Sequence, residues 1–292
     1  MADYPALLRV ADLLAPKFRK AFLDAVKELD GQLATRDILD ALARGDVRAL
    51  ERAGAWRVFA DALEPALREA VLEAVARGGD QAANLLPRSV QVQLTFDRTN
   101  PKAIEAVDTV VANALQDITN ASKDAVVAVI RDGFTDGDTP QQMARSIRDA
   151  IGLTERFALA VEHYRDGLID NGVAVGRAND LAETYSDRLL RLRATQIART
   201  ESIRAASAGQ HGAWLDAASQ GLLDRSGARR HWIVTPDDRL CPICEAIPDL
   251  NPDGVGLDEP FQTDVGPVMY PPAHPLCRCA VTLHIQKEAM AA

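Results

Sequence analysis

All four cysteines of this 292-residue chain lie in two short clusters between Cys241 and Cys279. The first cluster is Cys241-Pro242-Ile243-Cys244, and the second is His274-Pro275-Leu276-Cys277-Arg278-Cys279. Two cysteines separated by two residues in a tight turn can place both sulfurs on one metal ion. We therefore predict that the two clusters come together and form a metal-binding module.

Tetrahedral zinc takes four ligands, and the two clusters offer five candidates. We favour four sulfurs, with His274 as the alternative ligand; the cysteines are Cys241, Cys244, Cys277 and Cys279. If the chain is extended from residue 277 to 285, the second pair of sulfurs shares one face with the apolar residues that follow. Packed reduced thiols and a disulfide are the alternatives to a metal.

The chain before residue 221 has the hydrophobic period of long helices. Helices are predicted over residues 7–26, 35–50, 56–76, 101–130, 143–151, 154–169 and 181–215. Gly78-Gly79 predicts a helix end, and Thr139 with Gln142 predicts a capping box. Alternating apolar residues predict a short strand near 89–96, and two β-prone segments follow residue 221, at 231–234 and 280–285.

These patterns predict a mainly α fold, in which a long helical region precedes a small α+β Cys/His module with short strands. The predicted domains are an N-terminal helical region at 1–87, a helical core at 88–220, the Cys/His module at 221–286 and a tail at 287–292.

The net charge of −9 argues against a protein that coats nucleic acid through a general basic surface. No segment approaches the roughly 18 apolar residues of a membrane span, and the N-terminus lacks the features of a secretory signal. We therefore expect synthesis in the cytoplasm and no membrane contact. Clustered cysteines in a reducing compartment favour metal over disulfide.

Several other residues are candidates for functional or structural roles. The basic residues Arg188, Arg191, Arg193 and Arg204 are candidates for contact with an acidic partner or DNA, although such residues usually form a solvated helix face. Arg199 and Glu201 do not face each other on a helix, so we expect structural roles for them, as for Trp232. Three or more thiolates close the coordination sphere of zinc, which favours a structural site without catalytic residues or a small-molecule substrate.

Three segments of the chain form a distinctive combination: Ile197-Ala198-Arg199-Thr200-Glu201, the run from Asp237 to Cys244 after Trp232, and the run from Pro271 to Cys279. They resemble the phage head morphogenesis family, the Mu F-like minor capsid proteins of tailed phages and prophages. The resemblance extends over residues 140–285, and its metal pattern matches here at both cysteine pairs and His274. The first hundred residues resemble nothing that we can align.

The resemblance implies a minor capsid protein of a tailed phage, a prophage or a gene-transfer particle. Such a protein associates with the portal and the capsid interior during head assembly and DNA packaging or delivery. Its implied partners are the portal protein, major capsid or scaffold proteins and packaged DNA, and its implied location is the virion head. The alternatives are a zinc-dependent hydrolase or nuclease acting during genome delivery, and a DNA-contacting protein that uses the basic residues at 188–204.

Overall fold

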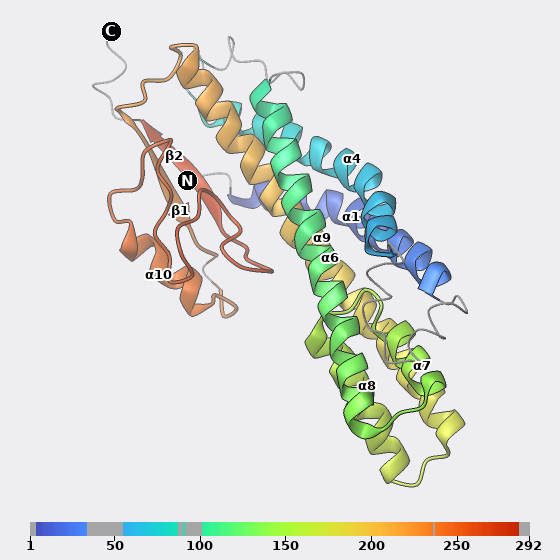
Figure 1. The fold of residues 1–292 in the computed structure, drawn as a ribbon. Helices are drawn as coiled ribbons and strands as arrows, with labels where there is room; N and C mark the ends of the chain where they lie inside the picture. The colour runs from blue at the N-terminus through green and yellow to red at the C-terminus, as the bar shows by residue number, and fades with distance from the viewer. Residues whose placement is uncertain (1–3, 34–54, 87–89, 91–100, 236, 286–292) are drawn as a thin grey trace. The chain divides into compact units, whose positions relative to one another are not determined.

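The computed structural model describes residues 4–33, 55–86, 90, 101–235 and 237–285. This part of the chain contains seven helices and one two-stranded sheet, so the fold is mainly α, as predicted (Figure 1). The elements are α1 Tyr4–Leu33, α4 Ala55–Asn84, α6 Pro101–Asp136, α7 Pro140–Ala150, α8 Glu155–Asp170, α9 Val175–Ser219, β1 Ala228–Ile233, α10 Pro242–Leu250 and β2 Ala280–Ile285.

Some predicted segments lie outside the described residues. These are the helix near 35–50, the tail at 287–292 and the strand near 89–96, of which only Val90 is described and is helical. No helix in the described ranges is long and apolar enough to cross a membrane.

The chain divides into two compact units. The first unit comprises Met1–Phe18, Leu67–Ala112 and Gln196–Ala292, and the second comprises Arg19–Ala66 and Asn113–Thr195. The domain boundaries expected near residues 87 and 220 remain predictions.

In the second unit, α7 begins with the predicted capping box. The Gln142 backbone N–H donates to Thr139 Oγ1 at 3.4 Å, and the Thr139 backbone N–H donates to Gln142 Oε1 at 2.9 Å. These bonds satisfy backbone donors that the first turn of a helix otherwise leaves unpaired. Further along this region, buried Arg165 of α8 forms ion pairs with Asp149 and Glu162, which ties α7 to α8.

Two glycines of the first unit allow α4 and α9 to pack backbone against backbone. A Cβ atom on Gly78 would lie 1.9 Å from the carbonyl oxygen of Ala206, and one on Gly209 would lie 1.9 Å from that of Val75. The prediction that α4 ends at Gly78-Gly79 is wrong, because the helix continues to Asn84. Gly78 serves helix packing here and is not a C-cap.

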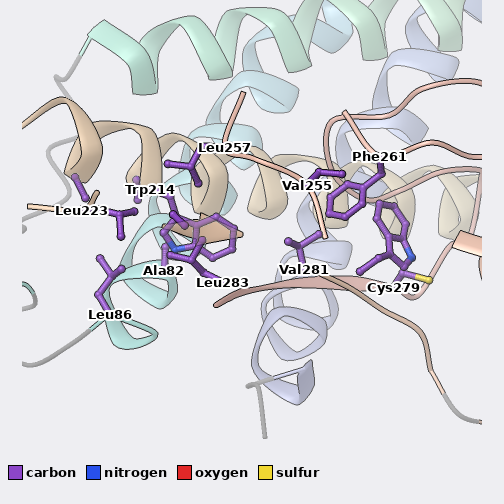
Figure 2. Close-up of a cluster of buried hydrophobic side chains, with 14 of the residues drawn as sticks. Ala82, Leu86, Trp214, Leu223, Val255, Leu257, Phe261, Cys279, Val281 and Leu283 are labelled. Atoms are coloured by element: carbon purple, nitrogen blue, oxygen red, sulfur yellow. The ribbon is translucent and has the colours of Figure 1, made fainter. Parts of the chain in front are cut away.

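The two strands form an antiparallel pair next to this helix crossing in the first unit. Trp232 of β1 is paired with Val281 of β2, and one face of the sheet joins a hydrophobic cluster (Figure 2). That cluster includes Ala82 of α4, Leu86 from the turn after it and Trp214 of α9, whose side chain is among the largest that are fully buried. The sheet is thus attached to the helices through apolar packing.

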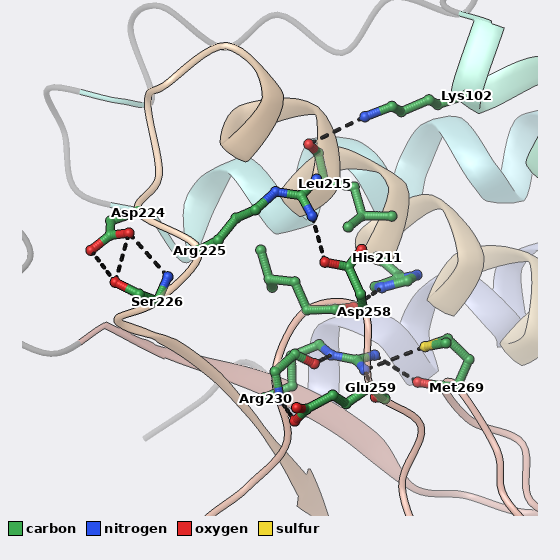
Figure 3. Close-up of polar contacts among 12 residues, drawn as sticks. Lys102, His211, Leu215, Asp224, Arg225, Ser226, Arg230, Asp258, Glu259 and Met269 are labelled. Atoms are coloured by element: carbon green, nitrogen blue, oxygen red, sulfur yellow. Dashed lines mark hydrogen bonds and ion pairs between the residues drawn. The ribbon is translucent and has the colours of Figure 1, made fainter.

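A buried arginine of β1 organises the loop between the two cysteine clusters. The Arg230 side chain is 0% exposed and donates to the carbonyl oxygens of Gly256 at 3.0 Å, of Met269 at 2.7 Å and of Glu259 (Figure 3). Its guanidinium also lies over the Phe261 ring, 5.2 Å from the centroid. Burial lowers the pKa of Arg230 to about 10, so the group stays cationic at neutral pH.

Candidate metal centre

The first cysteine pair lies at the N-terminus of α10. Cys241 is the N-cap residue, and its Sγ accepts a hydrogen bond of 3.4 Å from the Cys244 backbone N–H. Pro242 occupies the start of the helix, where its missing N–H costs nothing. The tight turn expected from the spacing is therefore the first turn of a short helix.

His274 presents one ring nitrogen to this pair. Its Nε2 lies 3.1 Å from Cys241 Sγ and 3.0 Å from Cys244 Sγ, while its Nδ1 lies 2.8 Å from the Pro275 carbonyl oxygen. Because a carbonyl oxygen can only accept, Nδ1 carries the proton of the neutral ring. The Nε2 lone pair therefore faces the two sulfurs, which is the tautomer that binds metal through Nε2.

The second cysteine pair approaches the first through Cys244. Cys277 and Cys279 are each 1% exposed, and Cys277 Sγ lies 3.7 Å from Cys244 Sγ. Two sulfurs on one tetrahedral zinc ion, each with a bond of about 2.3 Å, are separated by roughly 3.8 Å. The 3.7 Å separation of the two sulfurs is thus compatible with a shared ion.

The five candidate ligands form two overlapping groups. One contains Cys241, Cys244 and His274, the other contains Cys244, Cys277 and Cys279, and within each group all donor atoms lie within 4.8 Å of one another. Cys244 belongs to both. The structure therefore brings together every ligand candidate that the sequence predicts, and the clusters can hold a metal ion.

The electrostatics of the buried sulfurs suit a bound cation. Hydrogen bonds from the thiols of Cys244 and Cys279 lower the pKa of Cys277, whereas the bond to Cys277 raises the pKa of Cys244. Without a cation the group can hold one thiolate easily, but further negative charge is repelled. Thiolates with an imidazole are a donor set that selects zinc among the common metals.

An ion pair fixes the backbone between the last two cysteines. Arg278 donates to both carboxylate oxygens of Asp237, at 2.5 and 2.6 Å, and its carbonyl oxygen accepts from Thr235 Oγ1 at 2.9 Å. The guanidinium holds the pKa of Asp237 well below its usual range. The segment after β1 is thereby tied to the second cysteine cluster.

Thr200 is a contact that the sequence analysis missed. This residue of α9 is 6% exposed, and its Oγ1 accepts a hydrogen bond of 3.0 Å from the Leu276 backbone N–H. Leu276 has a φ of 62°, a left-handed conformation that costs a leucine energy. The Thr200 hydroxyl thus holds the turn between His274 and Cys277 in place. Its position between Arg199 and Glu201 was the only sequence signal.

Replacing Thr200 by valine is expected to weaken zinc binding about tenfold, because partners that orient ligands typically contribute tenfold or more to metal affinity. Valine keeps the shape of threonine and removes the acceptor for the Leu276 N–H. Competition with a chromogenic chelator measures the affinity. Thr195→Val, also on α9, is the control, because the Thr195 hydroxyl donates to the Arg191 carbonyl one turn earlier in the same helix. Equal affinities of the two variants would refute the role of Thr200.

The residues with expected structural roles all lie in the first unit. Arg199 Nη2 is 3.7 Å from Asp12 Oδ1 of α1, and buried Glu201 lies 3.2 Å from Arg204 Nε. Trp232 is 6% exposed and meets the Phe261 ring edge to face, with 5.2 Å between centroids. Their contribution to stability remains a prediction.

The basic residues considered for partner contact have different environments. Arg188 and Arg191 are exposed, and Arg204 is half-buried. Arg193 is 3% exposed and donates to the carbonyl oxygens of Gly152, Leu153 and Ile118, so its guanidinium cannot contribute to an exposed surface. Contact with an acidic partner or DNA remains a prediction for the exposed pair.

One comparison with known proteins gives a match. A family model described as "Phage Mu protein F like protein" matches residues 124–282, which is more than half of the chain. The matched region includes both cysteine clusters, His274 and Thr200. No curated protein and no solved structure matches the chain.

Proposed function

Since the chain belongs to the phage Mu protein F like family, a phage head morphogenesis family, we propose that it is a minor head protein that associates with the portal. In this proposal it lies at the portal vertex or in the capsid interior and acts during head assembly and DNA packaging or delivery. Portal protein and major capsid or scaffold proteins are its partners. The family match carries the proposal.

The Cys/His cluster supports a structural role in this protein. Cys244 and the four candidate ligands around it make five donors, while tetrahedral zinc needs only four, so no coordination position has to be left for water. Hydrolytic zinc sites keep such a position open. We infer that zinc, bound by sulfurs of both cysteine pairs with His274 as the alternative ligand, holds α10 and the segment 274–279 together.

In this proposal the bound metal contributes to head assembly by stabilising the Cys/His module. Zinc binding supplies folding free energy to a small unit, because its ligands are brought together only in the folded state. A module stabilised in this way can present a fixed surface to the portal. The exposed residues Arg188 and Arg191 are the candidates for contact with packaged DNA.

The test is co-expression of the chain with the portal and major capsid proteins encoded in the same genome. We expect wild-type chain to sediment with assembled heads and to stay with the portal when the shells are disrupted. The Cys241→Ser/Cys244→Ser variant is expected to be incorporated less, whereas Glu245→Gln, a change at an exposed neighbour, should behave as wild type. Absence of the wild-type chain from purified heads would refute the proposal.

A further inference from the structure

The second unit contains a cavity far richer in carboxylates than in cations. Its volume is about 220 Å³, and it is lined by the end of α6, the second half of α8, residues of α7 and the start of α9. Six lining residues are acidic: Asp132, Asp136, Asp138, Glu162, Asp166 and Asp170. The lining cations are Arg145 and Arg165.

Arg165 does not neutralise this excess of negative charge. Its guanidinium donates to Glu162 and to Ser146, and it also pairs with Asp149, a carboxylate that does not line the cavity. The positive charge of Arg165 is therefore shared with Asp149, a buried acid outside the cavity lining. The walls keep a surplus of negative charge even after the ion pairs are counted.

The backbone adds to the negative potential at two places. Asp132 and Asp136 belong to the end of α6, and Asp166 and Asp170 belong to the end of α8. The C-terminus of a helix carries a partial negative charge, so acidic side chains are disfavoured there. The starts of α7 and α9 offset part of this field, but the Thr139–Gln142 capping box already satisfies donors of α7.

A buried carboxylate oxygen lacks a donor in this cavity. Glu162 is 7% exposed and lines the wall, and its Oε1 has no hydrogen-bond partner among the described residues. Its other oxygen accepts from Ser146 and Arg165. Buried polar atoms are nearly always paired with a protein group, an ordered water or a ligand, so this oxygen can accept a hydrogen bond from a donor outside the chain.

The pKa values of the acids that line the cavity also favour a bound cation. Burial raises the pKa values of Asp138, Glu162 and Asp166, and neighbouring carboxylates raise them further. Each of these shifts is what an acid shows when it lacks sufficient positive charge nearby. A cation in the cavity would favour the charged carboxylates.

The spacing of the carboxylates favours an extended cation over a metal ion. Calcium and magnesium gather oxygens at about 2.0–2.6 Å, so the ligand oxygens lie within roughly 5 Å of one another. In the described part of the chain, the only groups of three donors this close are those of the Cys/His cluster. The cavity wall also includes Val129, Ile169 and Val175, which suit the methylene groups of an organic cation.

We propose that this cavity binds an ammonium or guanidinium group carried on a methylene chain. The group comes from a free polyamine or from a lysine or arginine side chain of a partner protein. It donates hydrogen bonds to Glu162 Oε1 and to the carboxylates at the ends of α6 and α8. The proposal does not depend on the function proposed above.

Calorimetric titration of the full chain tests the site. The probes are spermidine, a short peptide with a single arginine, and magnesium and calcium chloride. The Asp138→Asn/Asp166→Asn variant is expected to bind the organic cations about tenfold more weakly, because two ion pairs are lost. Asp117→Asn/Asp124→Asn is the matched control, since both residues are exposed on α6 and do not line the cavity.

Each result of the titration either supports or refutes the proposed cation site. Tighter binding of spermidine supports a free polyamine, and tighter binding of the arginine peptide supports a partner side chain. The proposal fails if neither organic cation binds, if only the metal ions bind, or if the two double variants bind equally. The Asp138→Asn/Asp166→Asn change removes like-charge repulsion, so circular dichroism should show a folded protein.

Discussion

Replacing Cys244 by serine is expected to abolish zinc binding and to destabilise the first unit by several kcal/mol. Cys244 is the only candidate ligand that belongs to both donor groups, and it is 3% exposed. A serine hydroxyl is a far weaker zinc ligand than a thiolate, and the binding energy lost is also folding energy. Elemental mass spectrometry should find about one zinc per wild-type chain and almost none in the variant.

Glu245→Gln is the matched control for this change, because Glu245 is the next residue of α10 and is exposed. It should keep its zinc and the resistance of residues 221–285 to proteases. A wild-type protein purified under reducing, chelator-free conditions without metal would contradict the expectation. The four cysteines would then be packed thiols, and the function would rest on the family match.

Replacing Gly209 by alanine is expected to destabilise the protein by about 3 kcal/mol, near the upper end of typical overpacking costs. The new methyl group would lie 1.9 Å from the Val75 carbonyl oxygen, and a backbone atom cannot turn away as a side chain can. The α4 and α9 backbones of the first unit must therefore separate. Urea unfolding followed by circular dichroism measures the change.

Gly212→Ala, three residues further along α9, is the control. A Cβ atom at Gly212 meets nothing within 4 Å, and alanine has a higher helix propensity than glycine. This variant should be as stable as wild type or more stable, by up to about 1 kcal/mol. If both variants lose the same stability, the close packing at Gly209 has no special role.

Features set by neighbouring residues in the sequence could be predicted. The periodicity gave most helices, and the Thr139–Gln142 capping box depends on residues three apart. The two cysteine clusters also carry metal-ligand spacing, so their approach to each other could be anticipated from ligand chemistry. In each case the interacting groups are close in sequence or are donors that suit one metal ion.

Features set by distant residues could not be predicted. Gly78-Gly79 looks like a helix end in sequence, and only the approach of Ala206 explains why glycine is needed inside the helix. Arg193 looks like a surface cation until the carbonyl groups at 118 and 152 are placed around it. Thr200 has no local reason to bond to Leu276. Tertiary contacts override the local pattern at all these positions.

The separation of the two cysteine clusters along the chain has a consequence for the unfolded state. An ion held by both clusters closes the segment 245–273 into a loop. In the chain-entropy description of crosslinks, closing a loop of this length restricts the unfolded chain by about 4 kcal/mol. The metal would thus act as a reversible crosslink under reducing conditions, where a disulfide between the same sulfurs does not persist.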